Sequence, residues 1–525
     1  MRFSLPKSLL IIAALYPLVV FPFFPKWAVD DAYISYRYAD NLARQGQLTW
    51  NVGEEPVDGN TGLAWPIILA GFIGLGVSPI TASHSLGIAS FFFGGVMLWL
   101  LLRRLNVLPL SSALTVFFYA TVPLLFTHAL SGMETVFFVA TFLAALYLLA
   151  LVLTAPTRCS RSIIFFLLTL LLLGFIRPEG VVVSAFSLFA VGYYIWRSDR
   201  AYFGRFCVTA FLVYVLPMVG AAYWQWRYYG FVLPNTYYVK TITGFTVAYL
   251  ADFFRFFLRF FLAPMAAALI IVLVDFDMIC AGVKRRWAGI SWRPVTLVAG
   301  VIVAFFLVNL AQFLRSHLSV NFSYRFYMPL LVIFFILFGI FLGIGLQALG
   351  QSRTTQPLRY RAVVLVVVIL IGYQFLYYVK KLPEEVSFAN DQIILQESEH
   401  NLIGRTLRQI VPPTEWLVVY MDAGAMPYFS GLKTLDFGAL NDKRLAREHL
   451  TPTERVDYLF SVNPGVIVFS STQSDRLEYG AEAEAIIHDS RFQNYTLYKV
   501  YTTGVPSIEY NEFVYLRKDL TKKNI

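Results

Sequence analysis

Residues 136–153 read VFFVATFLAALYLLALVL, a run without a single charged side chain. An α-helix needs about 20 apolar residues, with a range of about 17–25, to cross the hydrocarbon core of a bilayer. The run therefore predicts a membrane-spanning helix. Ten further segments bring the expected number of spans to about eleven: 8–24, 85–102, 108–127, 162–176, 180–196, 207–223, 256–274, 294–313, 328–347 and 362–379.

The composition of the whole chain agrees with a polytopic membrane protein. Of its 525 residues, 58% are hydrophobic and 14% are charged, against about 45–50% and about 25% in soluble domains. A single soluble core stops growing near about 250–300 residues. The composition therefore excludes a soluble enzyme, a disordered chain and a small disulfide-stapled domain.

The charges divide the chain into two parts at Val379, where the long apolar runs end. Residues 380–525 carry 16 Lys and Arg against 20 Asp and Glu, a net charge of −4, whereas the whole chain carries +10. Residues 1–379 therefore carry +14, which indicates cytoplasmic loops rich in Lys and Arg. We expect a membrane domain at 1–379 and a soluble α/β domain at 380–525. The loop charges predict a cytoplasmic N-terminus and an extracytoplasmic C-terminal domain.

The region between the first two spans, about residues 27–80, is expected to lie on the outer side of the membrane. Its apolar part, 63–80, is short and contains five Pro and Gly residues that disfavour a continuous helix. We interpret it as an interfacial segment. The C-terminal part predicts a helix at Glu384–Leu407 and strands at Trp416–Met421 and Gly465–Ser470. A terminal hairpin is expected from Tyr495–Thr503 and Glu509–Arg517.

The first outer loop begins with an acidic pair, Asp30 and Asp31, directly after the first span. One interpretation is structural, because either carboxylate could cap a helix over residues 32–44. The other is chemical, since a carboxylate at the membrane surface could act as a general base while its neighbour orients it or binds a cation.

Polar residues in later outer loops fall on the same face as the acidic pair. Opposite charges gathered at the ends of apolar helices are candidates for a functional site. Purely structural roles are the alternative. Arg177 and Glu179 could form a simple loop ion pair, and Lys240 could be a snorkelling anchor at the membrane surface. The set comprises Glu134, Arg177, Glu179, Asn235, Tyr237, Lys240 and Arg325.

A lipid-linked phosphate is a suitable ligand for such cations. Arg binds phosphate bidentately and Lys binds it as a point charge. Transfer of a sugar from a lipid phosphate needs positive charge on the leaving group and a carboxylate base for the acceptor hydroxyl. The six histidines and three cysteines show no spacing typical of metal ligands.

A series of motifs stands in order along residues 30–442, and it resembles the GT-C type of membrane glycosyltransferase. The likeness is strongest to the terminal arabinofuranosyltransferases of the mycobacterial envelope and their relatives in other bacteria. Asn60 departs from the pattern, because relatives usually carry an aromatic residue there. The motifs are DDAYI at 30–34, RYA at 37–39, WN at 50–51, GE at 53–54, VDG at 57–59, SGMET at 131–135, RPEG at 177–180, PNTYYVK at 234–240, YRFYMP at 324–329, DAGAMPY at 422–428 and DFGALND at 436–442.

The resemblance implies an inverting transferase in the bacterial cytoplasmic membrane with a polyprenyl-phosphate sugar donor, arabinofuranose being the best guess. The acceptor would be a hydroxyl of a cell-envelope glycan or of a surface protein such as a pilin. The resemblance is compatible with a divalent cation. It implies catalytic roles for Asp30 and Asp31, donor-phosphate contacts from Arg177, Lys240, Arg325 and Arg37, and a sugar or acceptor site at Glu134, Glu179, Asn235, Tyr237 and Asp422.

Two other activities fit the same sequence. A lipid-linked sugar flippase or transporter should show repeated halves and polar breaks near the membrane midplane. No clear repeat is present, and the charges concentrate at one face. A glycan polymerase or ligase would also act at the outer face, but on a pyrophosphate-linked oligosaccharide, so the donor separates it from a transferase.

Overall fold

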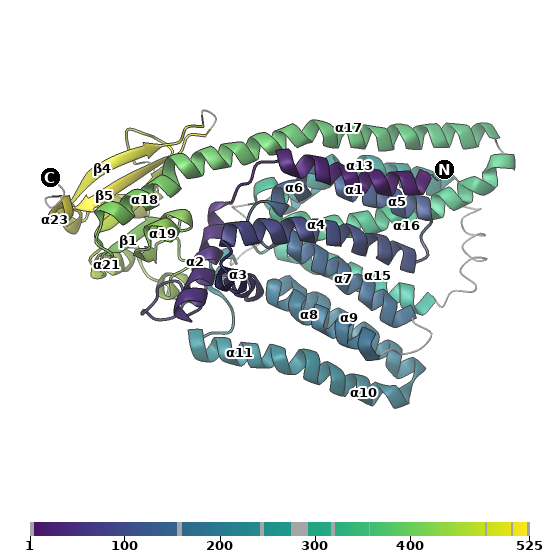
Figure 1. Ribbon diagram of the computed structural model, residues 1–525, viewed down its shortest axis with the longest axis horizontal. Helices are drawn as coiled ribbons and strands as arrows, with labels where there is room; N and C mark the ends of the chain where they lie inside the picture. The colour runs from purple at the N-terminus through teal and green to yellow at the C-terminus, as the bar shows by residue number, and fades with distance from the viewer. Residues whose placement is uncertain are drawn as a thin grey trace.

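The structure is a computed structural model, and it describes residues 5–154, 160–241, 246–274, 292–316, 321–355, 357–477, 480–505 and 508–521. Long helices lie roughly parallel in one bundle, and an α/β domain sits at one end of it (Figure 1). Helix α17 connects the two parts. The fold thus follows the predicted order, with the membrane helices first and the α/β domain last.

The helices of the bundle coincide with all eleven predicted spans. Among the described residues, nine helices are long and apolar enough to cross a membrane, or ten if the bent pair α5 and α6 is one span. The remaining predicted span is α8, which has only 17 residues. The bundle contains α1 (Leu5–Phe23), α4 (Pro79–Arg104), α5 (Pro109–Thr121), α6 (Pro123–Ala129), α7 (Thr135–Thr154), α8 (Ser160–Ile176), α9 (Pro178–Ser198), α10 (Arg200–Ala210), η1 (Phe211–Val215), α11 (Leu216–Tyr229), α13 (Ala248–Val274), α15 (Trp292–Phe313), η2 (Phe322–Tyr327), α16 (Met328–Thr355) and α17 (Pro357–Leu395).

Three shorter helices occupy the loops between spans. They are α2 (Asp30–Gln45), α3 (Ala64–Gly74) and α12 (Asn235–Lys240). Helix α3 has 11 residues, which is too short to cross a bilayer. Its length agrees with the interfacial interpretation of residues 63–80.

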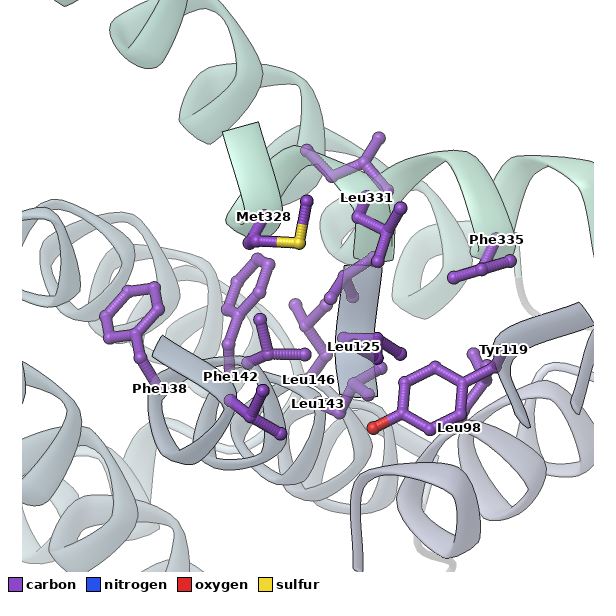
Figure 2. Close-up of a cluster of buried hydrophobic side chains, with 14 of the residues drawn as sticks. Leu98, Tyr119, Leu125, Phe138, Phe142, Leu143, Leu146, Met328, Leu331 and Phe335 are labelled. Atoms are coloured by element: carbon purple, nitrogen blue, oxygen red, sulfur yellow. The ribbon is translucent and has the colours of Figure 1, made fainter. Parts of the chain in front are cut away.

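The core of the bundle is built from aromatic and aliphatic side chains of helices that are distant in sequence. Leu98 of α4, Tyr119 of α5, Leu125 of α6, Phe142 of α7 and Leu331 of α16 meet in one cluster (Figure 2). The phenol of Tyr119 donates a hydrogen bond of 3.1 Å to the carbonyl oxygen of Phe91. This bond satisfies the polar atom that burial would otherwise leave without a partner.

The C-terminal domain contains one five-stranded sheet with the strand order β2-β1-β3-β5-β4. Strands β1 (Trp416–Tyr420), β2 (Lys433–Asp436) and β3 (Val466–Ser471) are parallel, whereas β4 (Tyr495–Thr502) and β5 (Asn511–Arg517) form the antiparallel hairpin. The two central strands and the hairpin were expected, but β2 was not. The helices of the domain are α18 (Asn401–Ile410), α19 (Ala425–Ser430), α20 (Lys443–Arg447), α21 (Pro452–Ser461), α22 (Gly480–His488), η4 (Ser490–Asn494) and α23 (Lys518–Thr521).

Helix α17 carries the chain out of the bundle and into the C-terminal domain (Figure 1). Its 39 residues span about 58 Å at 1.5 Å per residue, whereas the hydrocarbon core is about 30 Å thick. The boundary predicted after Val379 therefore lies inside a continuous helix. A π-helix, η3 (Gln396–His400), follows α17 directly.

Gly87 of α4 provides a test of the helix packing. A Cβ atom at Gly87 would lie 1.9 Å from the carbonyl oxygen of Ala129, whereas one at Gly71 of α3 would meet nothing within 4 Å. We expect Gly87→Ala to destabilise the protein by about 1–3 kcal/mol, the usual result of overpacking. Gly71→Ala should leave stability unchanged or slightly raised. Thermal unfolding of both variants in detergent measures the difference, and equal melting temperatures would contradict this close approach.

Candidate active site

A cavity of about 530 Å³ lies where the first loop, the start of α9, α12, α15 and η2 meet. Its walls combine apolar and charged side chains, and Leu440 of the C-terminal domain lines part of it. Seven of the eleven predicted site residues line this cavity: Asp31, Glu134, Arg177, Glu179, Tyr237, Lys240 and Arg325. Charges from five segments of the sequence are thus brought together at one place.

Helix α2 separates the two members of the acidic pair. The helix begins at Asp30 with Val29 as its N-cap residue, so both carboxylates lie in the first turn, where the helix dipole stabilises negative charge. Successive residues of a helix point about 100° apart. As a result Asp31 faces the cavity, whereas Asp30 faces the C-terminal domain. Neither residue caps the helix, contrary to the structural interpretation of the pair.

Asp31 forms an ion pair with Arg325. The Nη1 atom of Arg325 lies 3.0 Å from Oδ2 of Asp31, and 26% of the Asp31 side chain is exposed. Burial raises the pKa of Asp31, but the positive charges of Arg325 and Lys240 outweigh this effect, so the pKa lies below its usual value. The carboxylate is therefore ionised at neutral pH and in a position to accept a proton.

Arg325 is held by an unusual turn of the backbone. Ser323 and Tyr324 have φ angles of 42° and 60°, a region that costs about 1–3 kcal/mol for residues with a side chain. Two partly buried contacts hold Ser323: its carbonyl oxygen lies 2.9 Å from Nε2 of His128, and its hydroxyl donates to Glu385 at 2.8 Å. The strained turn thus directs the guanidinium of Arg325 to the cavity.

A second ion pair stands beside the first. Nε of Arg177 lies 2.7 Å from Oε1 of Glu134, and both side chains are buried. Burial raises the pKa of Glu134, but the charge of Arg177 overcomes this and holds the pKa below its usual value. The pair is therefore charged on both sides, and Glu134 fixes the orientation of Arg177. The expected loop pair between Arg177 and Glu179 is replaced by this one across the cavity wall.

Lys240 forms no ion pair within the described part of the chain. Its ammonium lies 5.9 Å from the centre of the Phe326 ring. Burial lowers the pKa of Lys240, while the charge of Asp31 acts in the opposite direction and does not fully compensate. The charge of Glu179 acts on Arg177, but the buried Oε2 of Glu179 accepts no hydrogen bond from the described residues. One cation and one carboxylate oxygen thus remain available to a bound molecule.

The structure does not bring four of the predicted residues to the cavity, and two of these are Arg37 and Asn235. The guanidinium of Arg37 is buried, donates to the carbonyl oxygens of Trp50, Pro427 and Leu432, and lies over the Trp50 ring. These contacts occupy the donors that a phosphate would need. The amide of Asn235 donates to the carbonyl oxygen of Asp442 and accepts from Arg447. Both residues hold the first loop and α12 to the C-terminal domain.

The other two, Asp30 and Asp422, lie at the junction between α2 and the C-terminal domain. Asp30 accepts hydrogen bonds of 2.8 Å from the backbone N–H groups of Gly424 and Ala425. Asp422, which the resemblance placed at a sugar or acceptor site, accepts hydrogen bonds from the hydroxyls of Ser470 and Tyr510. Asp30 therefore takes the place of a capping residue for α19, and α2 and α19 lie side by side (Figure 1).

His400 joins the same two carboxylates, and the sequence analysis missed it. Within the described residues, Asp30, His400 and Asp422 are the one group of this kind that could hold a metal ion, with ligand atoms within 4.8 Å of one another. The three residues lie up to 392 positions apart in the chain, so no spacing motif connects them. The group lies outside the cavity.

The whole fold is similar to solved structures of membrane glycosyltransferases. One is ArnT from Cupriavidus metallidurans bound to undecaprenyl phosphate, with a TM-score of 0.56, 10% sequence identity, and 97% of this chain and 98% of that chain covered. Another is the archaeal oligosaccharyltransferase AglB from Archaeoglobus fulgidus, in complex with an inhibitory peptide and a dolichol-phosphate. There the TM-score is 0.54, the identity 12%, and the coverage 96% of this chain and 74% of that chain.

The C-terminal part also matches a family. Residues 391–513 match the family described as Domain of unknown function (DUF8728). No curated protein matches the chain. The likeness to the solved structures confirms the predicted fold: the chain is a multi-pass membrane protein with the GT-C architecture and a C-terminal α/β region.

Proposed function

We propose that the chain is an inverting glycosyltransferase that takes its sugar from a polyprenyl-phosphate donor. The observation that carries the proposal is the cavity in which the Asp31 carboxylate stands beside Arg325 and Lys240. The similar solved proteins are described with undecaprenyl phosphate and dolichol-phosphate, which are lipids of the proposed donor class. The cavity lies among apolar helices. A polyprenyl chain is itself apolar and can pack in these surroundings.

Asp31 is the general base in this mechanism. Its carboxylate takes the proton of the acceptor hydroxyl as that oxygen bonds to C1 of the sugar, on the face opposite the phosphate. The bond between C1 and the phosphate oxygen breaks, and the electron pair leaves with the polyprenyl phosphate. Position favours Asp31 over Asp30 as the base, because both oxygens of Asp30 already accept backbone N–H groups.

Lys240 and Arg325 stabilise the leaving phosphate, which gains negative charge as the bond breaks. The negative charge of the bound phosphate offsets part of the positive charge of Lys240 and Arg325. The pKa of Asp31 therefore rises, and the carboxylate becomes a better base. Arg177 is less free to turn toward a phosphate because Glu134 holds it at 2.7 Å. Its role is to keep the cavity positive beside the donor.

The sugar and acceptor hydroxyls face Glu179, Glu134 and Tyr237. The buried Oε2 of Glu179 has no hydrogen-bond partner among the described residues, so a sugar hydroxyl would supply the missing donor. From the motif series we propose arabinofuranose as the sugar and a cell-envelope glycan or a surface protein such as a pilin as the acceptor. We also propose that the N-terminus is cytoplasmic and that the cavity opens on the outer side of the bacterial cytoplasmic membrane.

A donor panel tests the activity. The purified protein is incubated with polyprenyl-monophosphate sugars, including the arabinofuranose form, and with a polyprenyl-pyrophosphate oligosaccharide. We expect sugar release or transfer from a monophosphate donor alone. Turnover of the pyrophosphate donor would indicate a polymerase or ligase, and movement of lipid-linked sugar across vesicles without sugar release would indicate a flippase.

Substitution of each Asp tests the base. Asp31→Asn removes the proton acceptor and should lower kcat per folded molecule by about 10²–10⁴-fold, the usual contribution of a general base. Because it also removes the acid paired with the buried Arg325, the melting temperature should fall as well. Asp30→Asn places an amide NH₂ against a backbone N–H, so it should lower the melting temperature and cost much less turnover per folded molecule. Equal losses of kcat in the two variants would contradict the assignment.

Substitution of Lys240 tests the phosphate contact. A hydrogen bond to a charged group contributes about 1.5–3 kcal/mol, so Lys240→Ala should raise the donor KM by about 10-fold or more. Because its pKa lies below the usual lysine value, the ammonium loses its charge earlier as the pH rises, and Lys240→Arg should extend tight donor binding to higher pH. Lys443→Ala, which removes a Lys paired with Glu55 away from the cavity, is the control. An unchanged donor KM in Lys240→Ala would indicate a snorkelling anchor.

A further inference from the structure

A second buried polar cluster lies where η3 enters the C-terminal domain, and the proposed transfer reaction does not use it. Four carboxyl groups surround one imidazole: Asp30 of α2, Glu399 beside His400 in η3, Asp422 after β1, and Glu512 of β5. The side chains of Glu399 and Glu512 are completely buried, and His400 is 2% exposed. The cluster lies at the carboxyl ends of the parallel strands β1 and β3, the edge of an α/β sheet where ligands usually bind.

The π-helix η3 explains how the imidazole reaches this position. Residues Gln396–His400 form one wide turn between α17 and α18. A π-turn inside a helix costs regular hydrogen bonding and occurs frequently at functional sites. Here it places Glu399 and His400, which are adjacent in the chain, inside the same cluster.

Charge is not balanced in the cluster. The strongest electrostatic neighbours of Asp422 and Glu512 are His400 and other carboxyls, with no Lys or Arg among them in the part of the chain described. Buried carboxylates without positive partners are costly, and in proteins they become protonated, pair with cations or bind metal ions. One imidazole supplies at most one positive charge against four carboxyls.

Several polar atoms of the cluster also lack partners. Five buried atoms make no well-oriented hydrogen bond to the described residues: Nδ1 and Nε2 of His400, Oε1 and Oε2 of Glu399, and Oε2 of Glu512. Yet Nδ1 of His400 points at Asp30, 3.2 Å from Oδ1. A buried donor or acceptor left in this state requires an explanation such as an ion.

We propose that Asp30, His400 and Asp422 bind a divalent transition-metal cation, best matched by Zn²⁺. One nitrogen and two carboxylate oxygens lie within 4.8 Å of one another, and such a mixed set suits zinc better than magnesium or calcium. Each oxygen of Asp30 accepts one N–H group and has a second lone pair for the metal. The added charge of +2 compensates the buried carboxylates.

Glu512 orients the imidazole in this arrangement. Its Oε1 lies 3.5 Å from Nε2 of His400 and 3.0 Å from the hydroxyl oxygen of Ser470. A metal-binding His commonly donates its other N–H to a carboxylate, which fixes the tautomer and the ring. Nε2 thus carries the proton toward Glu512, and Nδ1 is left to bind the metal together with Asp30.

The metal would tie three segments together: the start of α2, η3, and the loop after β1. The inference rests on the donor set and its burial, and it does not depend on the proposed transfer activity. Its consequence is mechanical, because the segment it fixes is the first turn of α2, which also carries Asp31. Removal of the metal should therefore loosen the C-terminal domain from the bundle.

The metal content of the purified protein tests the inference. The full chain, prepared with a tag that contains no histidine, is stripped with a chelator, equilibrated with Zn²⁺ or Mn²⁺ and analysed by mass spectrometry. We expect one bound equivalent in the wild type and in His488→Gln, which changes an exposed His on α22. His400→Gln and Asp422→Asn should lose it, and only the wild type and control should melt at a higher temperature with metal. Wild type without bound metal, or His400→Gln with as much as wild type, overturns the proposal.

A measurement on the wild type alone covers the case in which a variant does not fold. X-ray absorption at the zinc edge of the loaded protein should show oxygen ligands and the scattering of one imidazole. A spectrum without imidazole would place the metal elsewhere and overturn the assignment to His400. Limited proteolysis with and without chelator reports the junction, and faster cleavage near η3 after chelation is the expected result.

Discussion

Two adjacent carboxylates at the start of α2 hold the functional end of this molecule together. Asp30 binds the backbone of the C-terminal domain and Asp31 binds Arg325. Because successive residues of a helix point about 100° apart, one helical turn serves both contacts and fixes their relation. Any shift of α2 that breaks the contact of Asp30 therefore also moves Asp31 in the cavity.

The cavity is surrounded by apolar helices, and this constrains how its charges are arranged. A charge in such surroundings is stable when it is paired or faces a polar space. The pairs Glu134–Arg177 and Asp31–Arg325 satisfy two acids and two bases. Lys240 has no acid bound to it among the described residues, and an anion is the ligand that its ammonium favours.

The sequence was sufficient for the fold and for most of the cavity. Long uncharged runs predict helices, and the expected position of Asp31, Lys240 and Arg325 in outer loops grouped them as candidates before any contact was known. It was insufficient where contacts join segments hundreds of residues apart. Nothing local distinguishes Arg37, which the carbonyl groups of the C-terminal domain bind, from a phosphate ligand. Strand β2 has only four residues, too few for an alternating pattern to be recognised.

His400 is the clearest residue that could not be predicted from the sequence. Its neighbours Asp30 and Asp422 lie close to it only because α2 packs against the C-terminal domain. The tightness of that docking is visible at Gly59 and Gly424, where an added Cβ would lie 2.0 Å from Asn441 and from Asp30 respectively. Only glycine permits the first loop and the C-terminal domain to approach so closely. The C-terminal domain is therefore a wall of the cavity and, through its contact with Asp30, supports the helix turn that carries Asp31. A cavity built in this way depends on the junction as much as on the membrane helices.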